Sequence, residues 1–379
     1  MLVARGLPIS AMSKNNVIHS VSRRNILGVG AGLLAGAGTA AAVRAQPGQG
    51  FDAAWTTAQL RPSIEGEVFA SRGGVIDQSQ AFAEALSSAA DAGRPLLLGP
   101  GQYRLSNINL PEGSDIRGVP GQTKIIYAGD GYLFAAQNVQ HIRLANLSFD
   151  GENRPFAERN GALFRGRKVA RLHIEGNRFS GSAGNAILLE KCGGSITGNF
   201  ISGSRLAGIH SFNGDQLMIA GNEIADSGNI GIGVWRWSAG NDGSQILNNT
   251  IRATAALDGG TGQNGNGISI FQANNVQIAH NMIADSAFSA IRNNGGSNVQ
   301  VLGNQCLRSA EVAIFIEFAF EGSQVQNNLI DDAGDGISIS NFDRGGRLAL
   351  IQGNLIRNIT RDFSAPGWKG KTGVGIHAE

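Results

Sequence analysis

The amino-acid sequence predicts an all-β fold, a right-handed parallel β-helix whose coils contain about 22–25 residues each, with an N-terminal capping helix. Two repeated strings support this prediction. The string Ile/Val-x-Gly/Asn/His-Asn-x-Ile/Phe/Cys occurs eight times, and a second string, Gly/Ala-Ile-x-Ile/Val, follows most copies by about ten residues. The composition agrees, because the chain of 379 residues is 42% hydrophobic, which is too apolar for disorder.

The first string places one asparagine in each coil. Asparagine tolerates a left-handed backbone, and its amide can bond to the asparagine of the next coil. We therefore expect a structural column at a tight turn. Its members are Asn177, Asn199, Asn222, Asn249, Asn281, Asn304, Asn328 and Asn354.

The second string places one isoleucine in each coil, at successive spacings of 22, 23, 36, 23, 23, 23 and 39 residues. Leucine-rich repeats have a similar period, but their L-x-x-L-x-L frame is absent and no coil shows a helical period. Short β-branched runs broken by Gly and Asn indicate three strands per coil around one core. The inward residues are Ile187, Ile209, Ile232, Ile268, Ile291, Ile314, Ile337 and Ile376.

A helix is expected before the coils, at about residues 77–92. Asp77 to Gln80 has the form of a capping box, and Gly93 follows the run AFAEALSSAADA as a stop signal. Such a helix would cover the open strand edges of the first coil. We expect residues 46–76 to be a lead-in and residues 77–379 to be the β-helix.

Residues 1–45 have the layout of an export signal. Ser22-Arg23-Arg24-Asn25-Ile26-Leu27 resembles the twin-arginine motif, and an Ala/Gly-rich apolar stretch leads to the small-residue pattern Val43-Arg44-Ala45. That stretch is too short for a transmembrane anchor, so none is expected in the mature form. The signal predicts bacterial export by the twin-arginine translocase, to the periplasm or beyond the cell.

The charge distribution excludes a nucleic-acid-binding surface. The formal charge of +2 depends on the first 45 residues, which carry five basic residues and no acidic one. The remainder has 26 basic and 29 acidic residues, so it lacks the basic surface that nucleic-acid binding requires.

The two cysteines are expected to be free thiols. Cys192 and Cys306 lie five coils apart in the repeat. At about 4.8 Å per coil they are separated by roughly 24 Å, far more than a disulfide spans. Cys306 is expected to point inward as a small apolar residue.

The helix, the Gly-Pro-Gly-x-Tyr-x-Leu segment and the Asn-x-Ile coils together resemble the pectate-lyase-type right-handed parallel β-helix superfamily over about residues 50–379. With the Ser-Arg-Arg signal, the whole chain resembles the twin-arginine-translocated repeat proteins, whose function is not established. The superfamily includes lyases, hydrolases, epimerases and non-catalytic tailspike-like or adhesive proteins. The resemblance therefore specifies the fold and leaves the activity open.

Strand alternation points the residues one and three positions after each inward isoleucine to the outer face. Phe212, Trp235 and Phe271 then lie on successive coils, which is unusual for a solvated face. Rings stack on sugars, and polar side chains hold hydroxyls or carboxylates. A sugar-binding groove is one interpretation, and a satellite core under folded loops is the other. The proposed substrate-binding residues are His210, Phe212, Trp235, Trp237, Phe271, Asn294 and Arg344.

Insertions flank the regular coils of Ile268, Ile291 and Ile314. Extra residues follow Trp235 and occur within ATAALDGGTGQNG before Ile268, and further insertions surround the coil of Ile337. The regular coils are thus expected to form the floor of a cleft between two walls, with Phe271, Arg292, Asn294 and Glu317 on the floor.

Arg292 and Glu317 occupy adjacent coils and should lie within about 10 Å of each other. The superfamily resemblance implies that an arginine can remove the proton next to a uronate carboxylate. We therefore propose Arg292 as base or carboxylate clamp, with Glu317 or Asp343 as partner. A surface ion pair is the structural alternative. Hydrolysis would need a second carboxylate, from Asp343 or Asp258.

Other chemical motifs are missing from the sequence. The NTD, GHG and RIK strings of polygalacturonases, the DPHD string of mannuronan epimerases and the usual pectate-lyase arginine signature are absent. Asp331, Asp332 and Asp335 are close enough to suggest Ca²⁺, but Asp332 shares a turn column with Asp226 and Asp285, which is typical of turn chemistry. No cofactor is expected.

These patterns favour an exported protein that binds a polysaccharide or oligosaccharide. If the protein is an enzyme, it is a lyase, an epimerase or a glycoside hydrolase. The alternative is a non-catalytic structural or adhesion protein of the cell envelope.

Overall fold

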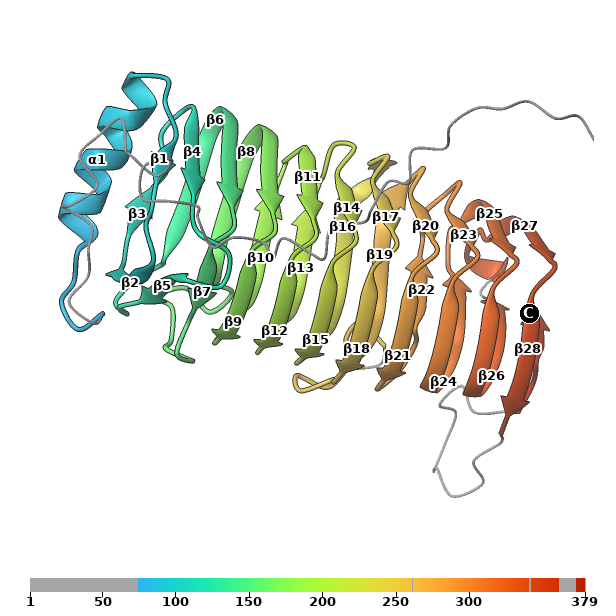
Figure 1. The fold of residues 1–379 in the computed structure, drawn as a ribbon. Coiled ribbons are helices and arrows are strands. Elements are labelled where there is room, and N and C mark those ends of the chain that lie inside the picture. Colours follow the sequence, from blue (N-terminus) through green and yellow to red (C-terminus); the bar gives the residue numbers. More distant parts are fainter. Residues whose placement is uncertain (1–73, 261, 341, 361–372, 379) are drawn as a thin grey trace, which may run out of the picture. The chain divides into compact units, whose positions relative to one another are not determined.

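The computed structural model describes residues 74–260, 262–340, 342–360 and 373–378. It confirms an all-β parallel solenoid of about 11 turns, with about 24 residues per coil and one helix near its N-terminal end (Figure 1). The expected export signal and most of the lead-in lie outside the described residues. No helix among the described residues is long and apolar enough to cross a membrane.

Each coil contributes strands to three parallel stacks. The first stack contains β3 (Ile108–Asn109), β10 (Asn185–Glu190), β13 (Ala207–Phe212), β16 (Ile230–Asn241), β19 (Asn266–Asn274), β22 (Ile291–Asn294) and β29 (Ile376–Ala378). The second contains β1 (Leu96–Leu97), β4 (Ser114–Arg117), β11 (Gly194–Thr197), β14 (Met218–Ala220), β17 (Gln245–Leu247), β20 (Gln277–Ala279), β23 (Gln300–Leu302), β25 (Glu321–Gln326) and β27 (Arg347–Gln352).

The third stack contains β2 (Gly101–Leu105), β5 (Thr123–Tyr127), β7 (Ser148–Asp150), β9 (Arg178–Ser182), β12 (Phe200–Ser204), β15 (Glu223–Ser227), β18 (Thr250–Thr254), β21 (Met282–Ser286) and β28 (Leu355–Ile359). Four longer strands each belong to two stacks. They are β6 (Phe134–Ala145), β8 (Ala162–Glu175), β24 (Gln305–Glu317) and β26 (Leu329–Ser340).

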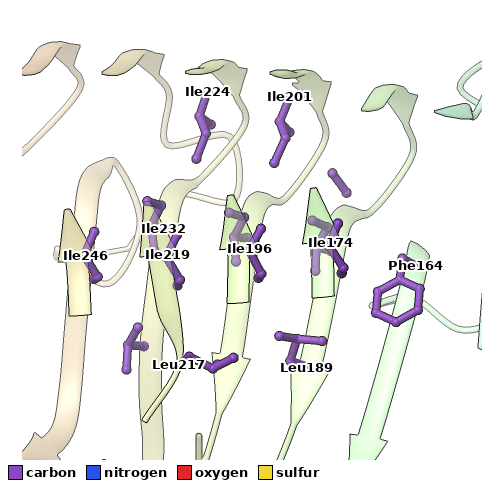
Figure 2. Close-up of a cluster of buried hydrophobic side chains, with 14 of the residues drawn as sticks. Phe164, Ile174, Leu189, Ile196, Ile201, Leu217, Ile219, Ile224, Ile232 and Ile246 are labelled. Carbon is purple, nitrogen blue, oxygen red and sulfur yellow. The ribbon is translucent and has the colours of Figure 1, made fainter. Parts of the chain in front are cut away.

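The isoleucine column forms as predicted in the first stack. Ile187 pairs with Ile209, and the same register continues coil by coil to Ile376. The members from Ile187 to Ile337 have no exposed surface. Figure 2 shows the inward side chains of neighbouring coils meeting in one core. Each buried isoleucine contributes roughly 1.5–3 kcal/mol, so this column is a large term in the free energy of folding.

The asparagine column is a buried hydrogen-bond ladder. Asn222, for example, donates from its backbone N–H and from its amide to the side-chain oxygen of Asn249, both at 2.9 Å. Its amide also donates to the carbonyl of Ile196 at 2.9 Å. The same pattern runs from Asn177 to Asn354.

The expectation of left-handed backbone at these asparagines was wrong. The positive φ falls on the preceding residue of each string, for example +63° at Gly221 and +55° at Asn248. Glycine suits this position because a left-handed backbone costs it nothing. The turn residue therefore bends the chain, which leaves the following asparagine free to point inward and bond to the next coil.

The predicted helix is α1 (Ser79–Asp91), whose Phe82, Leu86 and Ala89 are buried. Gly93 has a φ of +62° and ends the helix as expected. The capping box does not form: Asp77 accepts from the backbone N–H of Ser79 at 2.8 Å, while the amide of Gln80 donates to Glu84. Gln80 therefore bonds forward along the helix, and the helix has no reciprocal cap.

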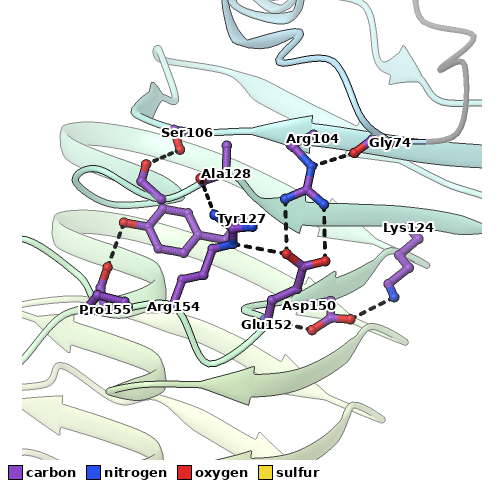
Figure 3. Close-up of polar contacts among 11 residues, drawn as sticks. Gly74, Arg104, Ser106, Lys124, Tyr127, Ala128, Asp150, Glu152, Arg154 and Pro155 are labelled. Carbon is purple, nitrogen blue, oxygen red and sulfur yellow. Dashed lines mark hydrogen bonds and ion pairs between the residues drawn. The ribbon is translucent and has the colours of Figure 1, made fainter.

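Polar contacts tie the first coils together beside the helix. Arg104 donates two hydrogen bonds of 3.1 Å to the carboxylate of Glu152, which also accepts from Arg154 at 3.0 Å (Figure 3). The side chain of Tyr127 is buried in the same region, and its ring stacks on Phe156 at 5.0 Å. The loop that follows β7 is therefore held against the first coils.

Both cysteines are free and buried, as expected from their separation. Burial raises the pKa of Cys192 to about 11 and that of Cys306 to about 12. Both thiols are thus protonated at neutral pH and behave as core residues.

Replacing one ladder asparagine tests the importance of this column. Asn249→Ala leaves the N–H of Asn222 and the carbonyl of Ile219 without their buried partner, which should cost about 3 kcal/mol of unfolding free energy. The control Gln277→Ala removes one 3.4 Å side-chain contact on the second stack and should change stability by less than about 0.5 kcal/mol. Urea titrations of the two variants provide the comparison. Equal losses would contradict a central role for the ladder.

Candidate functional site

The outward face of the first stack carries the candidate site. The register places Leu188, His210, Gly233, Ser269 and Arg292 in one outward column. A second column contains Glu190, Phe212, Trp235, Phe271, Asn294 and Glu317. Both columns are those that strand alternation predicts. Residues up to 127 positions apart in sequence therefore lie on one outward face, which is formed by β10, β13, β16, β19, β22 and β24.

The aromatic residues form a continuous row. Trp235 is perpendicular to the ring of His210 at 4.6 Å and to that of Phe212 at 5.8 Å, and it lies 5.9 Å from Phe271. Its indole N–H donates to the hydroxyl of Ser269 at 3.1 Å, which fixes the ring plane. All four rings are half-buried. The row thus combines packing between rings with ring surface left open to solvent.

His210 occupies space that the next coil leaves open. A Cβ atom at Gly233 would lie 2.6 Å from the imidazole ring of His210, so this ring position requires glycine at residue 233. Nε2 is buried and has no hydrogen-bond partner among the described residues, although part of the side chain reaches solvent. Burial lowers the pKa of His210 far below its usual range, so the ring is neutral at pH 7.

A pocket of about 370 Å³ lies over β16, β19 and β22. Its floor follows the predicted aromatic and polar columns, and the insertion before β19 supplies one lining residue, Gln263. Phe318, which directly follows β24, supplies another. The lining residues are Trp235, Gln263, Ser269, Ile270, Phe271, Arg292, Asn294 and Phe318.

Arg292 and Glu317 form an ion pair in this pocket region. The Nε atom of Arg292 donates to Oε1 of Glu317 at 2.6 Å, and the Nη2 atom contacts the same oxygen. Their side chains are only 10% and 4% exposed. The ion pair of the structural alternative therefore forms, but it is buried and not exposed at the surface as that alternative expected.

The donors to Glu317 all converge on one oxygen. Asn294 donates to Oε1 at 3.1 Å, beside the Nε and Nη2 atoms of Arg292, which is on the same strand. Among the described residues, no donor contacts Oε2 of Glu317. Burial raises the pKa of this carboxyl, and the nearby Arg292 charge opposes that rise. The arrangement therefore holds one oxygen of a carboxyl group that is buried behind Arg292.

The insertion before β19 is fastened over the site. Asp258 pairs with Arg205 and accepts from the amide of Asn229 at 2.8 Å, while its own N–H donates to that residue at 3.0 Å. Gly262 lies against the guanidinium, since a Cβ there would be 2.0 Å from Nη1 of Arg292. The insertion therefore covers one side of Arg292.

A second pocket, of about 210 Å³, lies on the other side of Trp235, over β10 and β13. Trp235 lines both pockets, so they are neighbours along the stack. The remaining lining residues of this pocket are Asn160, Asn185, Leu188, Leu206, Ala207, His210, Phe212, Asn229, Ile230 and Asn264.

Four proposed residues do not line either pocket, namely Trp237, Glu317, Asp343 and Arg344. Asp343 and Arg344 form an exposed ion pair with each other at 3.3 Å, so Asp343 does not partner Arg292. Trp237 is 63% exposed and lies beside Phe212 and Lys191. The residues expected to form the second wall, Asp343 and Arg344, therefore do not line the pocket, whereas Phe318 does. Asp258 is also unavailable as a second carboxylate, because it anchors the insertion.

Sequence reasoning missed several lining residues. Gln263 and Asn264 lie within an insertion that was identified, but the path of its backbone does not follow from the repeat. Asn160 comes from the loop before β8, where no repeated string marks an insertion. Phe318 directly follows the outward Glu317, and its left-handed φ of +61° marks the turn.

No group of three or more His, Cys, Asp and Glu side chains suited to a metal ion occurs in the described ranges. Asp331, one of the aspartates considered for Ca²⁺, instead pairs with Arg357 and accepts from Asn358. The carboxylate of Asp331 therefore forms contacts between neighbouring coils.

Removing the charge of Arg292 tests the energetics of the buried pair. Arg292→Met should destabilise the fold by about 3 kcal/mol at pH 7, because Glu317 is left buried and ionised. Without the arginine, the pKa of Glu317 in the folded state rises further above its unfolded value. The lost stability should therefore return below that folded pKa, as Glu317 takes up a proton.

The matching double variant, Arg292→Met with Glu317→Leu, should recover most of the loss. Chemical denaturation at pH 7.5 and pH 4.5 measures both effects against the parent. A deficit that is the same at both pH values would show that Glu317 is not the charge left unpaired.

Comparison with known proteins supports the fold assignment. The family model described as "Right handed beta helix region" matches residues 135–305. No curated protein matches the sequence. Among solved structures, the A-module of mannuronan C-5 epimerase AlgE4 from Azotobacter vinelandii is 14% identical, with a TM-score of 0.57, and the match covers 82% of this chain and 97% of that module.

The A-module of the Azotobacter vinelandii epimerase AlgE6 is 18% identical over 82% of this chain and 96% of that module, with a TM-score of 0.53. The enzymatically active domain of tailspike protein 2 from bacteriophage CBA120 is 14% identical over 80% of this chain and 50% of its own, with a TM-score of 0.51. At these identities the likeness concerns the fold alone. The described coils thus form a right-handed parallel β-helix.

Proposed function

We propose that this β-helix binds a polysaccharide along the outward face of its first stack, with Arg292 holding the carboxylate of a uronate unit. One observation carries the proposal: exposed ring surface of Trp235 and Phe271 shares a pocket with Arg292, whose ion-pair partner Glu317 lies behind it. Aromatic faces stack on the apolar faces of sugars, and a guanidinium matches a carboxylate in shape and charge.

The geometry of the stack suits a linear polymer. Equivalent positions recur at about 4.8 Å from coil to coil, so a chain lying along the stack meets a new set of side chains at each coil. The two pockets on either side of Trp235 extend this surface over neighbouring coils. A polymer therefore contacts more of the face than a single sugar does.

The chemistry that the site favours is proton transfer next to a uronate carboxylate, as in a lyase or epimerase. Arg292, which lines the pocket, would bind the substrate carboxylate and stabilise the negative charge that develops beside it, while Glu317 holds the guanidinium in place from behind. Hydrolysis is disfavoured, because the described residues that line the pocket include no carboxylate, whereas hydrolysis normally uses two. The solved neighbours named as mannuronan epimerases support this reaction class by analogy of fold alone.

A non-catalytic scaffold of the cell envelope is the competing function. The contacts among His210, Phe212, Trp235 and Phe271 support it, because such a row also stabilises the outer face. Binding measurements separate the two functions, since a scaffold has no reason to bind oligosaccharides at this face.

Variants of the pocket should weaken binding of an oligogalacturonate. Phe271→Ala removes ring surface and should cost about 1 kcal/mol of binding free energy. Arg292→Lys keeps the charge but loses the planar fork, which should weaken uronate binding roughly tenfold and leave neutral oligosaccharides unaffected. Calorimetric titration measures both changes.

Controls for these variants lie on the third stack. Phe200→Ala removes an outward ring that sits under Arg178, and Arg308→Lys changes an arginine that pairs with Asp285. Neither should alter binding. If the parent binds no acidic or neutral oligosaccharide, the scaffold is the better function. If it binds uronates, the appearance of unsaturated products or of the epimerised sugar distinguishes catalysis from binding alone.

We also propose that the protein is exported to the periplasm or beyond by the twin-arginine translocase, as expected of a twin-arginine-translocated repeat protein. The proposal rests on Arg23 and Arg24 within Ser-Arg-Arg-Asn-Ile-Leu. Replacing both arginines by lysine should retain the full-length chain in the cytoplasm, as measured by cell fractionation. Unchanged export of that variant would contradict this route.

A further inference from the structure

The two pockets beside Trp235 differ in charge. In the pocket over β16, β19 and β22, Arg292 is the charged lining residue among those described, and Glu317 lies directly behind it. The pocket over β10 and β13 has no Asp, Glu, Lys or Arg among its described lining residues. Its polar groups are asparagine amides and the neutral imidazole of His210. One groove therefore has a charged section next to an uncharged one.

Two charged side chains at the borders of the uncharged section, Arg165 and Asp258, are already paired. Arg165, which precedes Leu188 in the same outward column, donates to Glu158 at 2.6 Å. Asp258 pairs with Arg205 at the other border. An acidic sugar entering this section would thus lose water without meeting a cation among the described lining residues, which is unfavourable.

The uncharged section has the groups that a neutral sugar needs. Leu188, Leu206 and Ile230 provide apolar surface, and the rings of His210 and Trp235 close one end. Asn160 is exposed at the border and can bond to hydroxyl or amide groups of a ligand. This combination suits a sugar with an apolar substituent, such as the methyl of an N-acetyl group.

We infer that the ligand is an acidic heteropolysaccharide in which a uronate next to Arg292 is joined to a neutral sugar on the other side of Trp235. The inference rests on the proposed function and adds the composition of the polymer. A homopolymer of uronates would place a carboxylate in the uncharged section, and a neutral homopolymer would place none beside Arg292, which then has Glu317 alone as an anionic partner. The alternating polymer avoids both losses.

Three oligosaccharides of equal length test this inference by calorimetric titration of the parent protein. A hyaluronan hexasaccharide alternates a uronate with an N-acetylated sugar, an oligogalacturonate hexamer carries a carboxylate on every unit, and chitohexaose is uncharged. We expect hyaluronan to bind at least tenfold more tightly than the other two. Equal or tighter binding of oligogalacturonate would overturn the inference while leaving the proposed function intact. Absence of binding to all three would instead count against the proposed function.

A charge introduced into the uncharged section provides a second test. Asn264 is half-buried on the insertion and contacts the backbone oxygen of Gly259 at 2.8 Å, so Asn264→Lys changes the wall of the pocket without touching the core. The added cation should raise oligogalacturonate affinity roughly tenfold relative to hyaluronan. Gln300→Lys, an amide-to-lysine change on the second stack, is the matched control and should leave the ratio unchanged.

Thermal melting of both lysine variants confirms that they are folded before binding is compared. If Asn264→Lys folds and leaves the ratio of the two affinities at the parent value, the uncharged section does not contact the polymer and the inference fails. If the variant is unstable, the titrations of the parent protein with the three oligosaccharides decide the question alone.

Discussion

The asparagine ladder is the interaction on which the rest of the structure depends. Each amide holds the backbone of the preceding coil and donates to the asparagine side chain of the next one, and its oxygen and nitrogen are both used in a dry interior. A coil shifted by one residue would leave several buried polar groups unpaired and would turn its isoleucine outward. The ladder thus sets one register for all three stacks, including the outward columns of the site.

This fixed register explains how the site is assembled from distant parts of the chain. Phe212, Trp235, Phe271, Asn294 and Glu317 come from five coils, yet they occupy equivalent positions on neighbouring strands. Extra residues are accommodated in turns, as at 255–265, and in the irregular part of β16 between Trp235 and Gly240, while the ladder keeps one asparagine per coil. The insertions differ from coil to coil, so they vary the walls of the groove while the floor keeps its spacing.

The sequence predicted the floor of the site more accurately than its walls. Once Ile209 or Ile291 is known to point inward, the two-residue period of a strand gives the inward and outward positions. The proximity of Arg292 and Glu317 follows from the spacing between coils. Loop paths have no such period. Asp343 was therefore assigned to the wrong place, while Asn160 and Gln263 were not identified. The left-handed residue of each turn was misplaced by one position, because both Gly221 and Asn222 tolerate that backbone.

Burial of the Arg292–Glu317 pair distinguishes it from the other ion pairs of the outer face. Pairs such as Arg308 with Asp285 remain about half exposed, and their contribution to stability is small. A buried pair loses the hydration of both charges, and well-packed apolar residues of similar volume often stabilise a fold as well or better. The neighbouring coils carry such residues in the same two columns, as with Phe271 and Phe315. Stability alone therefore does not account for two charges at this position. Their location beneath the open rings of the groove, with one carboxylate oxygen left without a donor from the described residues, fits a site maintained for a ligand.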